Sequence, residues 1–436
     1  MRRASRFCLS LLALFLINFA SGLPCRGANL EELRDIGGPA FNHDGSCVIL
    51  SRSNGFIQVW EVASGKMVAG DVALNTAAKG DIVSDDGKRF VVGFIGAASR
   101  VFDATTGKAV SPPLDLEATN EPVKWAVFSP DGGTVLIVGE KEIGVFAVST
   151  GKRLATIAME KAEDMQMTAG SAAFAAGGAL CFVINAKGEV TRYETKNWKP
   201  VGKPIQHPRG DSAMDFFFAV SEDGKWLATY EFPGENGPKA NLQIWDVAAE
   251  KPLGKPLATM NGFTARFLAN NRVLVVPERV GGSAKVNVHE LPSMKVAYTL
   301  RDHEDIEGPK TAVSPDGKWL LTWAADHQLD LFEVATGKLA GAYSAKSAVL
   351  RVYLAPDSSG CHIVFDNSAF GDQEHHDYYV VNLSFPEMKV TQTLRLTEKV
   401  NSTGLSPNGK HFLVGQGEGG KERLFLYDAA TLKPLK

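Results

Sequence analysis

Short apolar runs alternate with turn signals along most of the chain, and this pattern predicts β-strands rather than helices. The clearest turns are Ser129–Gly132 and Ser314–Gly317, both Ser-Pro-Asp-Gly, and Ser406–Gly409, which is Ser-Pro-Asn-Gly. This order is typical of a type I turn that ends in a left-handed residue, a conformation that glycine adopts without steric cost. A β-rich run follows each turn, and after a gap a second run ends in an aromatic residue.

The turns recur nine times at a nearly constant spacing. Between the last residues of successive turns the intervals are 42, 45, 46, 46, 47, 46, 43 and 49 residues. Those last residues are Gly45, Gly87, Gly132, Gly178, Gly224, Asn271, Gly317, Gly360 and Gly409. A period of about 45 residues is the length of one four-stranded propeller blade. The sequence therefore predicts an all-β fold, a β-propeller of four-stranded blades with nine repeat units; eight blades is the alternative.

Two aromatic residues connect this pattern to a known family. Trp245-Asp246 and Trp60-Glu61 stand where WD40-repeat proteins have their Trp-Asp pair, at the end of the third strand of a blade. From about Leu30 to Lys436 the chain resembles that family, in divergent form. The resemblance implies a rigid disc that presents loops to protein partners. The family's Gly-His pair before the first strand has only loose counterparts, at His207 and His303.

The N-terminal segment has the order of a secretory signal. Basic residues precede an apolar run from Cys8 to Phe19, and small residues follow it. The run is shorter than the roughly 20 residues that span a bilayer, so no transmembrane anchor is predicted. We expect residues 1–28 to be a signal peptide, cleaved after Gly22 or Ala28, and the protein to be secreted or periplasmic. Residues 29–436 would then form a single propeller domain.

The two ends of the repeat array are incomplete in complementary ways. The last unit, Leu424 to Lys433, stops one strand short of a full blade, whereas Leu30–Ile36 precede the first unit without a blade of their own. An open ring would leave strand edges exposed. We therefore expect strand 30–36 to pair with the last blade and close the ring.

Charge and cysteine content exclude some functions. The chain has 46 Lys and Arg against 49 Asp and Glu, a net charge of -3, and no basic stripe, so no nucleic-acid partner is expected. Only Cys47, Cys181 and Cys361 lie in the body of the chain, in different units. We predict that all three are free, buried thiols.

Motifs that resemble chemistry are weak. Gly415–Gly420 matches the dinucleotide pattern G-x-G-x-x-G but links two strands instead of a strand and a helix, so no cofactor is expected. His375, His376 and Asp377 are weak metal candidates, because adjacent histidines on one loop rarely bind the same ion. No G-x-S-x-G, H-E-x-x-H or C-x-x-C motif occurs.

These observations predict an exported, monomeric, non-catalytic scaffold that binds a protein or peptide. The alternative is a propeller enzyme, namely a hydrolase, lactonase or lyase with an axial or loop metal. Irregular loops on a regular scaffold are where binding residues are expected. The candidates for partner binding are Glu235, Arg279, Asp326, His327, Asp372, Glu374, His375 and Glu418.

Overall fold

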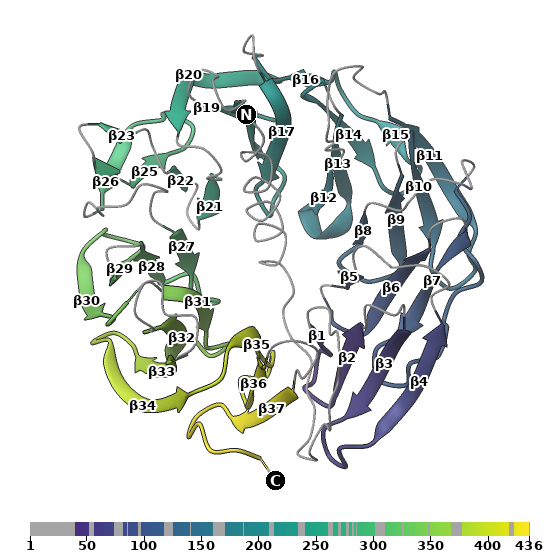
Figure 1. The fold of residues 1–436 in the computed structure, drawn as a ribbon. Coiled ribbons are helices and arrows are strands. Elements are labelled where there is room, and N and C mark those ends of the chain that lie inside the picture. Colours follow the sequence, from purple (N-terminus) through teal and green to yellow (C-terminus); the bar gives the residue numbers. More distant parts are fainter. Residues whose placement is uncertain are drawn as a thin grey trace, which may run out of the picture.

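The chain folds into a ring of antiparallel sheets in which the first strand of each sheet lies nearest the centre (Figure 1). The structure is a computed structural model. It describes residues 40–51, 56–73, 82–84, 86–94, 97–116, 125–139, 141–159, 171–185, 187–208, 213–233, 240–259, 265–268, 272–275, 279–280, 283–284, 286–300, 310–324, 327–347, 349–367, 377–417 and 423–435.

Among the described residues, nine sheets of three or more strands form nine blades in chain order. Blades 1 to 3 consist of β1 (Ala40–Phe41), β2 (Cys47–Ser51), β3 (Phe56–Glu61) and β4 (Met67–Ala73); β5 (Ile82–Val83), β6 (Arg89–Phe94) and β7 (Ala97–Asp103); and β8 (Trp125–Phe128), β9 (Thr134–Val138), β10 (Glu142–Ala147) and β11 (Arg153–Ala158). Blades 4 and 5 consist of β12 (Ser171–Ala175), a 3-10 turn η1 (Ala176–Gly178), β13 (Leu180–Ile184), β14 (Glu189–Glu194), β15 (Lys199–Pro200) and β16 (Ile205–Gln206); and β17 (Ala213–Val220), β18 (Trp226–Pro233), β19 (Ala240–Asp246) and β20 (Lys251–Thr259).

The remaining blades follow the same order. Blades 6 and 7 consist of β21 (Arg266–Leu268), β22 (Arg272–Val275), β25 (Asn287–Glu290) and β26 (Val296–Thr299), with an added hairpin of β23 (Arg279–Val280) and β24 (Ser283–Ala284); and β27 (Lys310–Val313), β28 (Trp319–Trp323), β29 (Gln328–Glu333) and β30 (Leu339–Ser344). Blades 8 and 9 consist of β31 (Val349–Leu354), β32 (Gly360–Asp366), β33 (Tyr378–Ser384) and β34 (Lys389–Leu396); and β35 (Val400–Leu405), β36 (His411–Gln416) and β37 (Arg423–Asp428).

The blade count is nine, as the repeat spacing predicts, and not the alternative of eight. Blades 2 and 9 have three regular strands, but single bridges occupy the fourth position in both. Phe102 pairs with Ala109 in blade 2, and Tyr427 pairs with Pro434 in blade 9. Every predicted repeat unit therefore corresponds to one blade.

The turns between the first and second strands have the predicted backbone. In blade 7, Gly317 is left-handed with φ 72°, and the Ser314 hydroxyl donates to the Asp316 carboxylate at 2.6 Å. The same hydroxyl accepts the Trp319 backbone N–H at 2.9 Å. A Ser-Pro-Asp-Gly turn thus satisfies its own polar groups, which explains why the motif recurs.

The turns between the third and fourth strands share a second and more regular backbone pattern. In all nine blades a left-handed residue followed by a lysine leads into the fourth-strand position, whether or not the left-handed residue is glycine. The nine pairs are Gly65-Lys66, Gly107-Lys108, Gly151-Lys152, Trp198-Lys199, Glu250-Lys251, Met294-Lys295, Gly337-Lys338, Met388-Lys389 and Leu432-Lys433. The Thr-Gly-Lys pattern in the sequence is the glycine form of this turn.

The left-handed residue of this turn packs against the preceding blade. A Cβ added to Gly337 would lie 2.4 Å from the ring of Tyr298 in blade 6, so only glycine fits beneath that side chain. Where the neighbour leaves space, a large apolar residue fills it: Met388 is buried with Leu331 of blade 7. Glycine and large hydrophobic residues therefore solve the same packing problem in different blades.

In several blades a side chain also donates a hydrogen bond to a backbone carbonyl in a turn of the next blade. Arg192 of blade 4 donates to the Val247 carbonyl of blade 5 at 2.7 Å. Arg272 of blade 6 donates to the Val334 carbonyl of blade 7 at 3.0 Å, and Asn382 of blade 8 donates to the Ala429 carbonyl of blade 9 at 2.7 Å. Each bond satisfies a carbonyl that the hairpin itself does not use.

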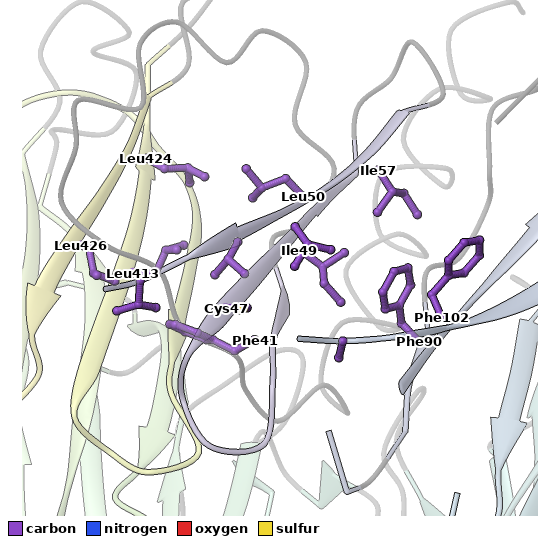
Figure 2. Packing of buried hydrophobic residues seen from close by; sticks show 14 of the residues in the cluster. Phe41, Cys47, Ile49, Leu50, Ile57, Phe90, Phe102, Leu413, Leu424 and Leu426 are labelled. Carbon is purple, nitrogen blue, oxygen red and sulfur yellow. The ribbon is translucent and has the colours of Figure 1, made fainter. Parts of the chain in front are cut away.

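The last blade packs directly on the first, which closes the ring. One apolar cluster contains Phe41 and Ile49 of blade 1 together with Leu413 and Leu424 of blade 9 (Figure 2). On the same seam, the Asn408 side chain donates to the Asp44 carbonyl at 2.7 Å. Closure therefore rests at least on apolar packing between sheets plus a contact between turns.

The sequence predicts that the last blade lacks its fourth, outer strand, and the structure differs from this in part. Pro434 bridges to Tyr427, and the Leu435 N–H donates to the Leu426 carbonyl at 2.8 Å, so the chain's own end begins a fourth strand there. Residues 30–36 lie outside the described residues, and their pairing with the last blade stays a prediction. The stretch Arg423–Phe425 of β37 is where such a strand would add.

Removing residues 29–37 from the mature protein tests that pairing. We expect a lower melting temperature and aggregation, because the outer edge of β37 would lose its partner. The comparison uses thermal melts and size-exclusion chromatography of the truncated and full mature proteins. Identical behaviour of the two would show that the ring closes without residues 30–36, through the contacts between blades 1 and 9.

The cysteines are free and buried, as predicted. Cys47, Cys181 and Cys361 form no disulfide. Burial raises the pKa of the Cys181 and Cys361 thiols well above the usual range. These two thiols are therefore packing residues rather than nucleophiles.

Candidate functional site

The strand order gives the ring two chemically different faces. We call the turn face the side that carries the turns between first and second strands and between third and fourth strands. The loop face carries the connections between second and third strands and between blades. Because successive strands are antiparallel, these two sets of connections lie at opposite ends of every blade.

The turn face is regular and its charges are matched. All nine lysines of the second turn type are exposed. Five residues before the lysine, seven of the nine turns carry an acid, as in Asp103 before Lys108 and Glu333 before Lys338. Matched charges at a repeated turn indicate a solvated structural surface rather than a site for one charged ligand.

Most predicted partner-binding residues are not among those described. Glu235, Asp326, Asp372, Glu374, His375, His376 and Glu418 lie outside the described residues. Arg279 lies on β23, in the hairpin that extends blade 6. His327 of blade 7 has a left-handed backbone, φ 65°, and its carbonyl accepts the Ala345 N–H at 2.8 Å, which is a structural role at the start of β29. The described candidates therefore lie on separate blades.

Asp377 is the one metal candidate that the structure describes, and it is already engaged. Arg395 Nε lies 2.5 Å from Asp377 Oδ1, and that bond is the main reason the pKa of Asp377 is lowered. The Tyr379 hydroxyl donates to Oδ2 at 3.3 Å. In the part of the chain that the structure describes, no group of three or more His, Cys, Asp or Glu side chains could hold a metal ion.

The inner strands carry an uneven distribution of charge that the loop-based prediction missed. We call the inner wall the nine strands β1, β5, β8, β12, β17, β21, β27, β31 and β35. Its sequence contains one acid, Asp215 on β17, and three bases: Arg266 on β21, Lys310 on β27 and Arg351 on β31. The bases come from three consecutive blades, 6 to 8, whose inner strands follow one another around the ring (Figure 1).

The three bases lack acidic partners among the described residues. Arg266 and Lys310 are exposed, Arg351 is half-buried, and none of them forms an ion pair there. Surrounding protein lowers the pKa of Arg266 by desolvation although the side chain still reaches solvent. Because little water solvates this cation and its side chain is still accessible, it attracts an anionic ligand more strongly than a fully solvated arginine does.

Blade 5 contains a buried hydrogen-bond chain that links the inner connection to the third strand. Trp245 Nε1 donates to the Thr229 hydroxyl oxygen at 2.8 Å, and that oxygen lies 2.7 Å from His207 Nδ1. The Thr229 oxygen thus accepts from tryptophan and shares one further hydrogen bond with the His207 ring nitrogen. His207 thus connects the segment before the first strand of blade 5 to Trp245 on the third strand, through Thr229 on the second.

The buried His207 makes the stability of the folded protein sensitive to acid. Burial lowers the pKa of His207 from 6.5 to about 4, so the unfolded chain binds a proton first as the pH falls. Stability is therefore full above pH 6.5 and is lost as the pH falls toward 4. From this residue we expect a loss of about 2 kcal/mol at pH 5 relative to pH 7.5.

Urea unfolding of the wild type and His207→Gln at the two pH values measures this effect. The glutamine variant cannot titrate, so its stability should fall less between pH 7.5 and pH 5. Equal losses in both proteins would assign the acid sensitivity to other groups, such as His362, whose pKa burial also lowers.

The comparisons with known proteins identify a fold and no more. No protein-family model matches the sequence, and no curated protein matches it. Among solved structures, a eukaryotic initiation factor matches with a TM-score of 0.62 and 15% identity, covering 90% of this chain and 95% of the other. The C-terminal WD40 domain of Sif2 matches with a TM-score of 0.52 and 11% identity, covering 93% and 99%. BamB from Moraxella catarrhalis matches with a TM-score of 0.51 and 14% identity, covering 77% and 94%.

Proposed function

We propose that this divergent WD40-like β-propeller is an exported, non-catalytic scaffold that binds a protein or peptide on its loop face. The proposal rests on the lengths of the connections between strands, which vary on the loop face and are nearly constant on the turn face. The connection from β9 to β10 runs only from Val138 to Glu142, whereas that from β32 to β33 runs from Asp366 to Tyr378. The connection from β22 to β25 contains an entire extra hairpin.

On the turn face, hydrogen bonds between turns hold neighbouring blades together. This structural role of the turn face supports a binding role for the loop face. The turns satisfy one another across blades, as where the His43 N–H donates to the Gly87 carbonyl at 3.2 Å and the Ala176 N–H to the Glu222 carbonyl at 2.7 Å. A rigid scaffold with irregular loops on one side is the usual arrangement of a binding protein. In the described residues no helix is long and apolar enough to cross a membrane.

Affinity capture from the native exported fraction tests the binding role. The bait is the mature protein, and the variant replaces residues 368–376 with the short β9–β10 connection, Gly139–Lys141, which keeps Asn367 and Asp377 in place. We expect a partner on the wild type that the variant loses at an unchanged melting temperature. A Lys108→Glu variant on the turn face serves as the control and should keep the partner. If the Lys108→Glu control loses the partner and the loop variant keeps it, binding is on the turn face and the proposal is wrong.

N-terminal sequencing of the exported protein tests the localisation separately. The chain should begin at Leu23 or Asn29, because cleavage is expected after Gly22 or Ala28. A chain that begins at Met1 in the exported fraction, or that stays in the cytoplasm, would contradict export.

A further inference from the structure

We propose that the inner wall of blades 6 to 8 binds an extended acidic peptide segment, with a carboxylate on every third residue. This inference rests on the proposed binding function and adds the chemistry of the partner. Arg266, Lys310 and Arg351 would each meet one carboxylate.

The concentration of positive charge is local and runs against the overall balance of the chain. The other six inner strands contain a single charged residue: five carry none, and β17 carries Asp215. The whole chain has a net charge of -3. A cluster of one sign on apolar walls focuses its field, which raises the local concentration of an oppositely charged ligand.

The three bases lie at nearly the same height on the wall. Lys310 and Arg351 each stand three residues before the last paired residue of their strands, Val313 and Leu354. Arg266 stands two residues before Leu268. One residue of strand corresponds to about 3.3 Å, a difference that a long side chain bridges easily.

Within the part of the chain that the structure describes, the donors of these side chains are largely unused. Among the described residues the only hydrogen bond of the Arg351 guanidinium is from Nη1 to the Leu350 carbonyl, at 2.9 Å. A guanidinium has five N–H donors and matches the two oxygens of a carboxylate. The desolvation that lowers the pKa of Arg266 also strengthens its attraction to an anion.

The spacing selects an extended peptide over a compact anion. Packed sheets lie about 10 Å apart, so three neighbouring blades spread the bases over about 20 Å. One small anion cannot contact all three. In a polyproline II segment, residues three apart lie on the same side and about 9 Å apart. Carboxylates at every third residue therefore match one base per blade.

Fluorescence anisotropy with synthetic peptides tests this match on the mature protein. The probe is a labelled peptide of Glu-Pro-Pro repeats with three glutamates. One comparison peptide has the same composition with the glutamates adjacent, and another has glutamine in place of glutamate. We expect the spaced glutamate peptide to bind at least tenfold more tightly than either, and binding to weaken as salt is added.

Three protein variants assign the binding to the inner wall. Arg266→Gln, Lys310→Gln and Arg351→Gln should each weaken binding about tenfold, as the loss of one charge-assisted bond implies. The triple inner-wall variant, which combines these three substitutions, should bind weakest. The matched control is the triple variant Lys108→Gln, Lys152→Gln, Lys338→Gln on the turn face, which removes the same charge and should bind like the wild type.

Several results would overturn the inference. They are equal binding of the spaced and adjacent peptides, no binding by the wild type, unchanged binding by the triple inner-wall variant, or displacement by a single-stranded oligonucleotide more readily than by the peptide. A captured native partner that still binds the triple inner-wall variant would contradict this inference and leave the proposed scaffold function intact.

Discussion

Replacing Gly337 with valine should destabilise the folded protein by about 2–5 kcal/mol, the sum of two separate costs. The left-handed backbone at φ 71° costs a residue with a side chain about 1–2 kcal/mol. The new Cβ would also lie 2.4 Å from two ring atoms of Tyr298, and such overpacking costs about 1–3 kcal/mol. That ring is held in place, because its hydroxyl donates to the Val334 carbonyl at 2.6 Å and Arg272 lies over it.

Gly177→Val is the matched control for this substitution. Gly177 has a similar backbone, φ 62°, but a Cβ there would meet no atom within 4 Å. It should therefore show only the backbone cost. Urea unfolding of both variants gives the difference, which is the steric cost of placing a side chain at position 337 against Tyr298 of blade 6. If both variants lose the same free energy, Gly337 has no packing role.

The repeat could be predicted from sequence because its turns are locally determined. A Ser-Pro-Asp-Gly turn satisfies its own hydrogen bonds, so the same residues recur at every position where the backbone needs them. The second turn type was harder to recognise, since Trp198, Met294 and Met388 are left-handed without being glycine. Tertiary packing decides those positions, and only the lysine that follows marks the turn in all nine blades.

The candidate site was predicted less well, for a physical reason. Loop residues were selected by their chemistry, but local sequence does not show which loops lie together. The bases of the inner wall could have been found by comparing the first strands of the nine units. The turn at residues 269–271 lacks glycine, however, so the sequence marks the boundary of β21 only weakly and does not identify Arg266 as an inner-strand residue. The role of His207 was equally hidden, because it depends on Thr229 and Trp245 of the same blade.

Removing the Arg192 side chain should cost about 3 kcal/mol, because it is nearly buried between blades 4 and 5. It donates to the Val247 carbonyl at 2.7 Å and to Glu250 Oε1 at 2.8 Å. Arg192→Ala leaves both acceptors without that donor and opens space at the interface, and breaking a buried pair in this way typically costs about 3–5 kcal/mol. The estimate lies at the lower end because the Glu250 side chain is 26% exposed.

Arg395→Ala removes an ion pair of the same type at the surface, where the arginine side chain is 62% exposed, and should cost much less, because solvent screens the two charges. Arg192→Met separates packing from charge. Arg192 Nε is buried and has no hydrogen-bond partner among the described residues, so methionine keeps the volume without burying that group. We expect urea unfolding to rank the losses as Arg192→Ala, then Arg192→Met, then Arg395→Ala. Equal losses for Arg192→Ala and Arg395→Ala would mean that the bonds of Arg192 do not hold these two blades together.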